Sequence, residues 1–176
     1  NVLYRVRPYE KIKGSANELY EKWAKKCLDS IKLTDKKSFN ENIWGIVRDF
    51  EKLEITNEIK PKVGLVGEIL VKFHPMANND VVNIVESEGA EAVMPGLIDF
   101  FLYGLFYNDF KYKYLAGSKF SQILAIAAIK LIESYRKTYK KALSNSNRFY
   151  APKSIKEIAN GAAPVISLGH QTGEGW

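Results

Sequence analysis

Cysteine is almost absent from this 176-residue chain, which contains only Cys27, and histidine occurs just twice. A single cysteine cannot form an internal disulfide, and it cannot complete a zinc or iron–sulfur site that is built from cysteines. We therefore expect a reduced, cytoplasmic setting. Cys27 lies on the apolar stripe of an expected helix, which favours an inert core thiol over a reactive one.

Long hydrophobic runs are also missing. The longest candidate, residues 123–132, is interrupted by Lys130 and is shorter than the roughly 18 apolar residues that a membrane-spanning helix needs. The opening residues NVLYRVRPYE do not have the apolar centre of a signal peptide. We therefore expect no membrane partner. Because 46% of the residues are hydrophobic, the chain has enough apolar material for one good core.

The net charge of +6 is spread unevenly along the chain. Residues 111–160 hold 11 basic and two acidic side chains, whereas residues 61–110 hold two basic and seven acidic ones. A basic segment attracts nucleic acid, phosphate-bearing ligands or an acidic protein surface, and a solvated helix face explains it equally simply. The basic and aromatic stretch FKYKYLAGSKF lies between two apolar helical segments rather than on exposed strands, so we predict no nucleic-acid partner.

Residues 1–60 are expected to form an N-terminal strand and a helical hairpin. The alternation in VLYRVR (2–7) favours a short strand. Two capping boxes, each a serine followed three residues later by a glutamate, mark helix starts at Ser15 and Ser38. Apolar residues recur at four-residue spacing in the first helix and share a face in the second, and a short polar turn joins the two.

Residues 61–176 are expected to form an α/β sheet domain. The apolar run 63–66 favours a buried parallel strand. A helix should then begin at about Asn79, with Asn78 or Asn79 as its cap, and the segment AEAVMP (90–95) should be the next strand. This order of signals predicts a compact βαβ crossover.

Three further helices and a third strand complete the expectation. Residues 96–110 are too apolar for a surface helix and should pack deep, and a short helix should end at Gly161. Residues 165–168 should form a third buried strand. The predicted fold class is thus α/β, a small parallel three-layer sheet of the Rossmann or flavodoxin type, incomplete at its C-terminal end. The longest helix, 118–144, should bury Ile123, Ile126, Ala127, Leu131, Tyr135 and Tyr139 and expose Lys130, Arg136, Lys137, Lys140 and Lys141.

Polar residues follow the ends of the expected strands. In an open parallel sheet, ligands bind beyond the carboxyl ends of the strands, so these loops should face one rim. The predicted catalytic set is empty. The candidate ligand-binding residues are Gly67, Glu68, His74, Asn78, Asn79, His170, Gly173 and Glu174.

The chemistry of this rim stays open on the sequence alone. Its first loop ends at a helix N-terminus, which favours a phosphate or carboxylate, but Gly-x-x-Gly is not the dinucleotide fingerprint and equally suits close packing. The last stretch, GHQTGEGW (169–176), is either a ligand loop or a structural turn. Histidine and glutamate suit zinc or iron, yet their wide separation leads us to predict no metal site.

Several long strings in the chain resemble one protein family. The strings are VLYRVRPYE, KPKVGLVGEILVKFHPMANNDVV, ESEGAEAVMP, DFFLYG, FKYKYLAGSK and ISLGHQTGEGW. They resemble the C-terminal part of the large acyl-CoA dehydratase activase-related proteins, which are relatives of the 2-hydroxyglutaryl-CoA dehydratase activators and D-components. The resemblance covers nearly the whole chain.

The resemblance implies a fragment of a protein that couples ATP hydrolysis to low-potential electron delivery for acyl-CoA dehydration in anaerobic bacteria. Such a parent would carry [4Fe–4S] and ATP with Mg, and its partners would be other domains of the parent chain, a dehydratase or activase component, and acyl-CoA. This chain departs from that pattern, since it has no activase nucleotide-binding motif and a single cysteine. No cluster or ATP role is carried over to any residue here.

Two roles follow as hypotheses. In the first, the chain is a scaffold and ligand-facing domain of an iron–sulfur parent and has no turnover of its own. In the alternative, it is a docking module that contacts ATP-dependent activase domains through the basic helix 118–144.

Overall fold

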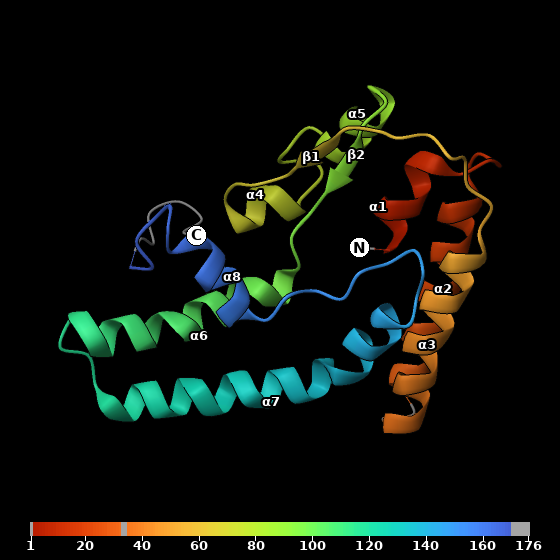
Figure 1. Ribbon diagram of the computed structural model, residues 1–176. Helices are drawn as coiled ribbons and strands as arrows, with labels where there is room; N and C mark the ends of the chain where they lie inside the picture. The colour runs from red at the N-terminus through yellow and green to blue at the C-terminus, as the bar shows by residue number, and fades with distance from the viewer. Residues whose placement is uncertain (1, 33–34, 170–176) are drawn as a thin grey trace. The chain divides into compact units, whose positions relative to one another are not determined.

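The computed structural model describes residues 2–32 and 35–169 (Figure 1). Within them the chain is mostly helical and carries a small parallel sheet of two strands. The expected division into 1–60 and 61–176 stays a prediction. The chain clusters into two compact units, the first made of Asn1–Gly64, Asp80–Met94 and Lys137–Ala151, and the second of Leu65–Asn79, Pro95–Arg136 and Pro152–Trp176.

A helical hairpin forms the body of the first unit. Helices α2 (Ser15–Ile31) and α3 (Lys36–Lys52) lie side by side, and the short helix α1 (Val2–Val6) packs against both (Figure 1). The hairpin predicted from apolar spacing is confirmed. Its buried core consists of Val6, Ala16, Trp23, Val47, Phe50, Ala142, Leu143 and Phe149.

The predicted strand at residues 2–7 is wrong. Residues 2–6 form α1, and the 3-10 turn η1 (Arg7–Tyr9) follows it. Val2 and Val6 are four residues apart, so the same apolar side chains also fit one face of a helix. Val6 is fully buried in the core of the hairpin, with Val2 packed against that core, and this packing overrides the weak strand propensity of the segment.

The two predicted capping boxes are also wrong. Gly14 occupies the cap position before α2, and the Glu10 carboxylate accepts hydrogen bonds from the N–H groups of Gly14 (2.6 Å) and Ala16 (2.8 Å). Before α3, the Asp35 carboxylate accepts from two N–H groups of the first helical turn. An upstream carboxylate takes the place of serine in both cases because an ionised acceptor makes the stronger hydrogen bond.

The sheet of the first unit is short. β1 (Lys62–Gly64) pairs in parallel with β2 (Glu91–Val93), and Val63 lies opposite Ala92. Helix α5 (Val81–Ser87) precedes β2. The parallel pairing predicted from the sequence is confirmed, but β1 is exposed rather than buried, and Val63 remains 39% exposed.

The second unit is helical. It contains α4 (Ile69–Phe73), α6 (Leu97–Tyr114), α8 (Ile155–Ala162) and most of α7 (Lys119–Ser144). α6 packs against α8, and α6 and α7 run antiparallel (Figure 1). The short helix expected to end at Gly161 is confirmed to within one residue.

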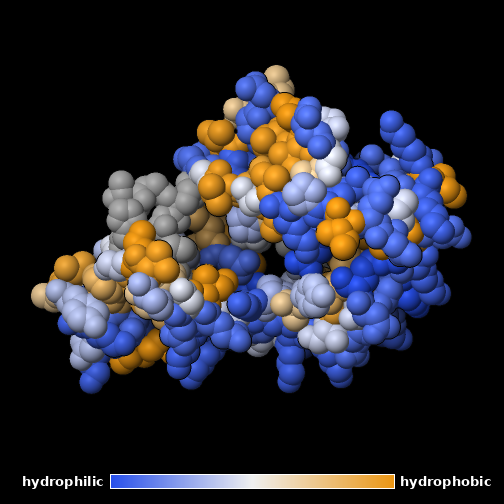
Figure 2. Space-filling model, turned by 45° about the horizontal axis from the view of Figure 1, so that its top comes forward, coloured by the Kyte–Doolittle hydropathy of each residue, from blue (hydrophilic) through white to orange (hydrophobic). Residues whose placement is uncertain are grey.

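The apolar helix α6 does not pack as deeply as its composition predicts. Leu102 is buried, but many of its large apolar side chains reach the surface, and Phe101 is 53% exposed. Figure 2 shows apolar side chains at the surface on the face that it presents, among a mostly hydrophilic surround. The expectation of a deeply buried helix is therefore wrong.

The buried face of α7 also differs from the expected one. Five side chains that were expected to be buried are exposed, Leu131 to 60%: Ile123, Ile126, Ala127, Leu131 and Tyr135. Ala125 and Arg136 are buried instead. Arg136, expected on the wet side, lies between Asp99 (2.9 Å) and Glu133 (2.9 Å), which compensate the charge that its burial removes from water.

The predicted third strand at 165–168 is wrong, because these residues form turns. The N–H groups of Val165 and Ile166 both donate to the Ala162 carbonyl (2.9 Å each), so they are not available to a sheet. The fold is therefore a mostly helical α/β arrangement with a small two-stranded parallel sheet. In the part of the chain that the structure describes, no helix combines the length and apolar character needed to cross a membrane.

Candidate functional site

The loop that follows β1 is built around the start of helix α4. Gly67 has φ +129°, which glycine reaches without the clash that a Cβ would cause. The Glu68 carboxylate accepts a hydrogen bond from the Val71 N–H (2.9 Å) and caps the helix. The N–H groups of Val71 and Leu70 hold the pKa of Glu68 below its ordinary value, because they stabilise the charged carboxylate.

Asn78 closes the other end of the same helix. Its Nδ2 donates to the carbonyl oxygens of Val71 (3.0 Å) and Lys72 (2.9 Å), which belong to the last turn of α4. The His74 carbonyl accepts hydrogen bonds from the N–H groups of Ala77 and Asn78, and the His74 residue is exposed. Side chains of the loop therefore form hydrogen bonds with both ends of α4.

Helix α5 begins without the predicted asparagine cap. Asp80 occupies its cap position, and Asn79 and Asp80 are both left-handed, each with φ 55°. The Asp80 Oδ2 accepts from the Asn83 Nδ2 (2.6 Å) instead of from the backbone of the helix. The N-terminus of α5, where an anion site was expected, therefore has no side-chain cap. The helix is also only seven residues long.

The structure brings one half of the predicted rim together. Glu68 and Asn78 hold the two ends of α4, with Gly67 before the helix and His74 directly after it. His170, Gly173 and Glu174 lie outside the described residues. The rim as a whole stays a prediction.

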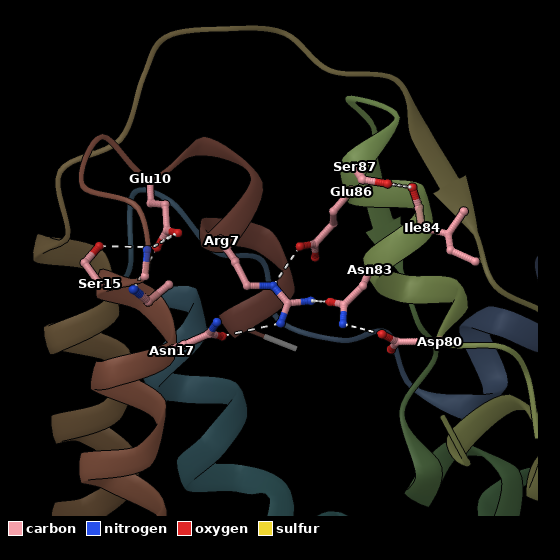
Figure 3. A network of polar contacts seen from close by, with 11 residues as sticks. Arg7, Glu10, Ser15, Asn17, Asp80, Asn83, Ile84, Glu86 and Ser87 are labelled. Carbon is pink, nitrogen blue, oxygen red and sulfur yellow. Dashed lines mark hydrogen bonds and ion pairs between the residues drawn. The ribbon is translucent and has the colours of Figure 1, made fainter. Parts of the chain in front are cut away.

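A polar network around Arg7 was not anticipated from the sequence (Figure 3). Arg7 Nε lies 2.7 Å from Glu86 Oε2, and its terminal nitrogens donate to Asn83 (3.0 Å) and Asn17 (3.4 Å). Arg7 thereby connects the hairpin with α5 inside the first unit. Glu86 is 79 residues away in sequence, so no local spacing could have indicated this contact.

The residues present do not fit the [4Fe–4S] cluster that the resemblance implies for a parent protein. Such a cluster needs several cysteine thiolates, and the chain has one. Cys27 is half-buried on α2, where it lines a hollow of the first unit with Trp23 and Phe50. Within 2–32 and 35–169, no three His, Cys, Asp or Glu side chains converge closely enough to hold a metal ion.

Comparison of the chain with protein-family models, with curated proteins and with solved structures finds no match.

Proposed function

We propose that this chain is a scaffold part of a 2-hydroxyacyl-CoA dehydratase or CoA-substrate-specific activase-related iron–sulfur protein, and that it has no turnover of its own. The long strings that resemble this family support the assignment. In this proposal the two-stranded sheet begins a larger Rossmann-like sheet that other parts of the parent complete. The parent works in the reducing cytoplasm.

One observation supports the scaffold role. The side chains of Glu68 and Asn78 form hydrogen bonds with backbone groups of α4. Glu68 caps the start of α4, and Asn78 binds two carbonyls at its end. A ligand site needs donors and acceptors that converge on the ligand. Because Glu68 and Asn78 converge on a helix instead, the loop is better suited to hold its own shape.

Substitutions of Glu68 in the full-length parent test this role. Glu68→Ala removes the cap, so we expect faster hydrogen exchange at the α4 amides. Glu68→Gln retains a side-chain oxygen acceptor and should preserve most of that protection and the acyl-CoA-dependent activity. Loss of activity in Glu68→Gln with α4 protection intact would show that the carboxylate contacts a ligand, against the scaffold role.

A second candidate function is docking to ATP-dependent activase domains. Lys137 and Lys141 are exposed on α7, in a part of the helix that lies in the first unit. Exposed lysines attract an acidic protein surface and speed its association, in a manner that salt weakens. This supports the basic long helix as the contact.

Charge reversal on α7 tests the docking candidate. Lys137→Glu/Lys140→Glu/Lys141→Glu should weaken association with the activase domains at least tenfold. A matched reversal on α2 and at its C-cap residue Lys32, Lys22→Glu/Lys25→Glu/Lys32→Glu, should leave the association within twofold. Equal losses in both variants would mean that net charge, and not α7, governs the contact.

A further inference from the structure

A hollow of about 670 Å³ lies between α2 and α3 in the first unit. Its volume falls within the roughly 300–1,000 Å³ of small-molecule sites. The α3 residues that line it recur at intervals of three and four and therefore share one face of the helix. The lining comprises Trp23 and Lys26 of α2 and Lys36, Lys37, Asn40, Glu41, Trp44, Gly45 and Arg48 of α3.

The residues that line this hollow carry an excess of positive charge, which Asp49 beside Arg48 reduces in part. Four of its lining residues are cationic, and Glu41 is the one acidic residue among them. Lys37 lies 3.9 Å from Glu41, and Arg48 lies 3.3 Å from Asp49, but both cations stay largely exposed. An excess of exposed cations around a concave surface favours an anionic ligand.

One partly exposed indole ring, that of Trp44, lies beside these cations. Trp44 is 37% exposed, so its ring is accessible to a ligand. Trp23 is buried, its Nε1 donates to Asp49 (3.1 Å), and Lys26 lies 4.6 Å from its ring centre. Gly45 has no side chain, and a Cβ there would overlap the Trp23 ring, so the two helices can approach closely at this point. The exposed ring of Trp44 favours a ligand that has an aromatic ring of its own.

The distance along α3 between the lysines and Trp44 indicates how far apart the charged and aromatic parts of a ligand should lie. Lys36 and Lys37 lie at the start of the helix and Trp44 lies seven to eight residues further on, a separation of roughly 11 Å at 1.5 Å per residue. We propose that this hollow binds a nucleoside polyphosphate, with the base on Trp44 and the phosphates beside Lys36 and Lys37. This site lies apart from the α4 loop and does not rest on the function proposed above.

Titration of the 176-residue chain with ATP, followed by tryptophan fluorescence and calorimetry, tests the site. Inorganic tripolyphosphate separates the contribution of charge from that of the base. We expect ATP to bind at least fivefold more tightly than tripolyphosphate, since stacking of one base on an aromatic side chain contributes about 1–3 kcal/mol. Trp44→Ala should remove this preference, and Trp44→Phe should retain most of it.

Lysine variants complete the test. Lys36→Gln/Lys37→Gln should weaken both ligands about tenfold, whereas Lys22→Gln/Lys25→Gln on α2, outside the hollow, should change both by less than twofold. Circular dichroism of each variant verifies that the hairpin is folded. The proposal is overturned if ATP and tripolyphosphate bind equally, if Trp44→Ala leaves the ATP preference unchanged, or if ATP does not bind at millimolar concentration.

Discussion

At the scale of single residues, acidic side chains accept hydrogen bonds from the first N–H groups of α2, α3 and α4. Asp35 and Glu68 cap α3 and α4 from the position directly before each helix, and Glu10 reaches the start of α2 from four to six residues upstream. The sequence pattern identified Ser15 and Ser38 because it considers a serine and a glutamate three residues apart. This pattern contains no information on the loop geometry that places Glu10 beside the start of α2.

The role of Glu10 predicts unequal effects of two substitutions at the start of α2. Glu10→Ala should lower the free energy of unfolding by about 1–2 kcal/mol, because two N–H groups lose their acceptor. Ser15→Ala should lower it by less than about 0.5 kcal/mol, because Ser15 lies inside the helix rather than at its cap. Urea unfolding measures both values. A larger loss of unfolding free energy for Ser15→Ala than for Glu10→Ala would show that Ser15, and not Glu10, caps the helix.

Tyr9 gives the first unit a defined response to alkaline pH. Its hydroxyl donates to Glu91 Oε2 at 2.7 Å, and Glu91 is buried. Burial, together with the hydrogen bond and the charge of Glu91, raises the pKa of Tyr9 to about 12. The protonated phenol is therefore favoured in the folded state, relative to an ordinary value of about 10.

This raised pKa predicts a loss of stability between about pH 10 and 12. The contribution of Tyr9 is complete below the unfolded-state pKa and is lost as the pH rises through the folded-state value. Tyr9→Phe should therefore show a shallower fall in unfolding free energy over this range than the unmodified chain. Tyr150→Phe, at an exposed position, is the control and should keep the full slope. Parallel slopes for all three proteins would contradict the assignment.

At the scale of elements, the sequence identified most helices correctly but not which face of α7 is buried. Apolar residues surround the first half of this helix, so hydropathy alone does not select one stripe. The buried positions include Ala125 and Arg136, which a hydrophobicity scale ranks below the exposed Leu131. Small size at Ala125 and ion pairing at Arg136 decided the packing, and neither appears in an apolar repeat.

Arg136 should stabilise the second unit through its ion pairs. Its side chain is 9% exposed and bridges Asp99 of α6 and Glu133 of α7. Arg136→Ala leaves both carboxylates without this partner and should lower the free energy of unfolding by about 1–3 kcal/mol. Lys137→Ala, at the exposed neighbouring position, should change it by less than about 0.5 kcal/mol. Equal effects in urea unfolding would show that the ion pairs are not stabilising.

The prediction of a third strand was wrong because of how the helix before it ends. The end of α8 continues into turns in which the Ala162 carbonyl takes two N–H groups, from Val165 and Ile166. A short apolar run predicts burial but cannot distinguish a strand from a turn that follows a helix. The first two strands were predictable because glycines and a helix separate them in the order typical of a βαβ unit.

At the scale of the whole molecule, many large apolar side chains of α6 and α7 remain at the surface. Soluble monomers rarely expose large contiguous apolar areas, so such surfaces commonly mark contacts with other protein parts. That these side chains contact other parts of a larger protein stays a prediction. The sequence did not indicate that they are exposed, because an apolar helix predicts burial.

The sequence also located the α4 loop, and the ligand-binding role expected for it stays a prediction. Glycines and polar residues after a strand predicted a ligand rim, and the same residues cap a short helix in the structure. The same residue types at the same place after a strand are compatible with a ligand-binding loop and with a loop that caps its own helix. Only the hydrogen-bond partners of Glu68 and Asn78 distinguish them.

Chemical-shift mapping of the chain with an acyl-CoA tests the scaffold role most directly. We predict no saturable shifts in the amides of residues 67–79 up to millimolar ligand, because the described polar groups of this loop serve α4. Shifts confined to α2 and α3 would belong to the proposed nucleotide site and would leave this claim intact. Saturable shifts centred on residues 67–79 that disappear in Glu68→Gln would contradict it.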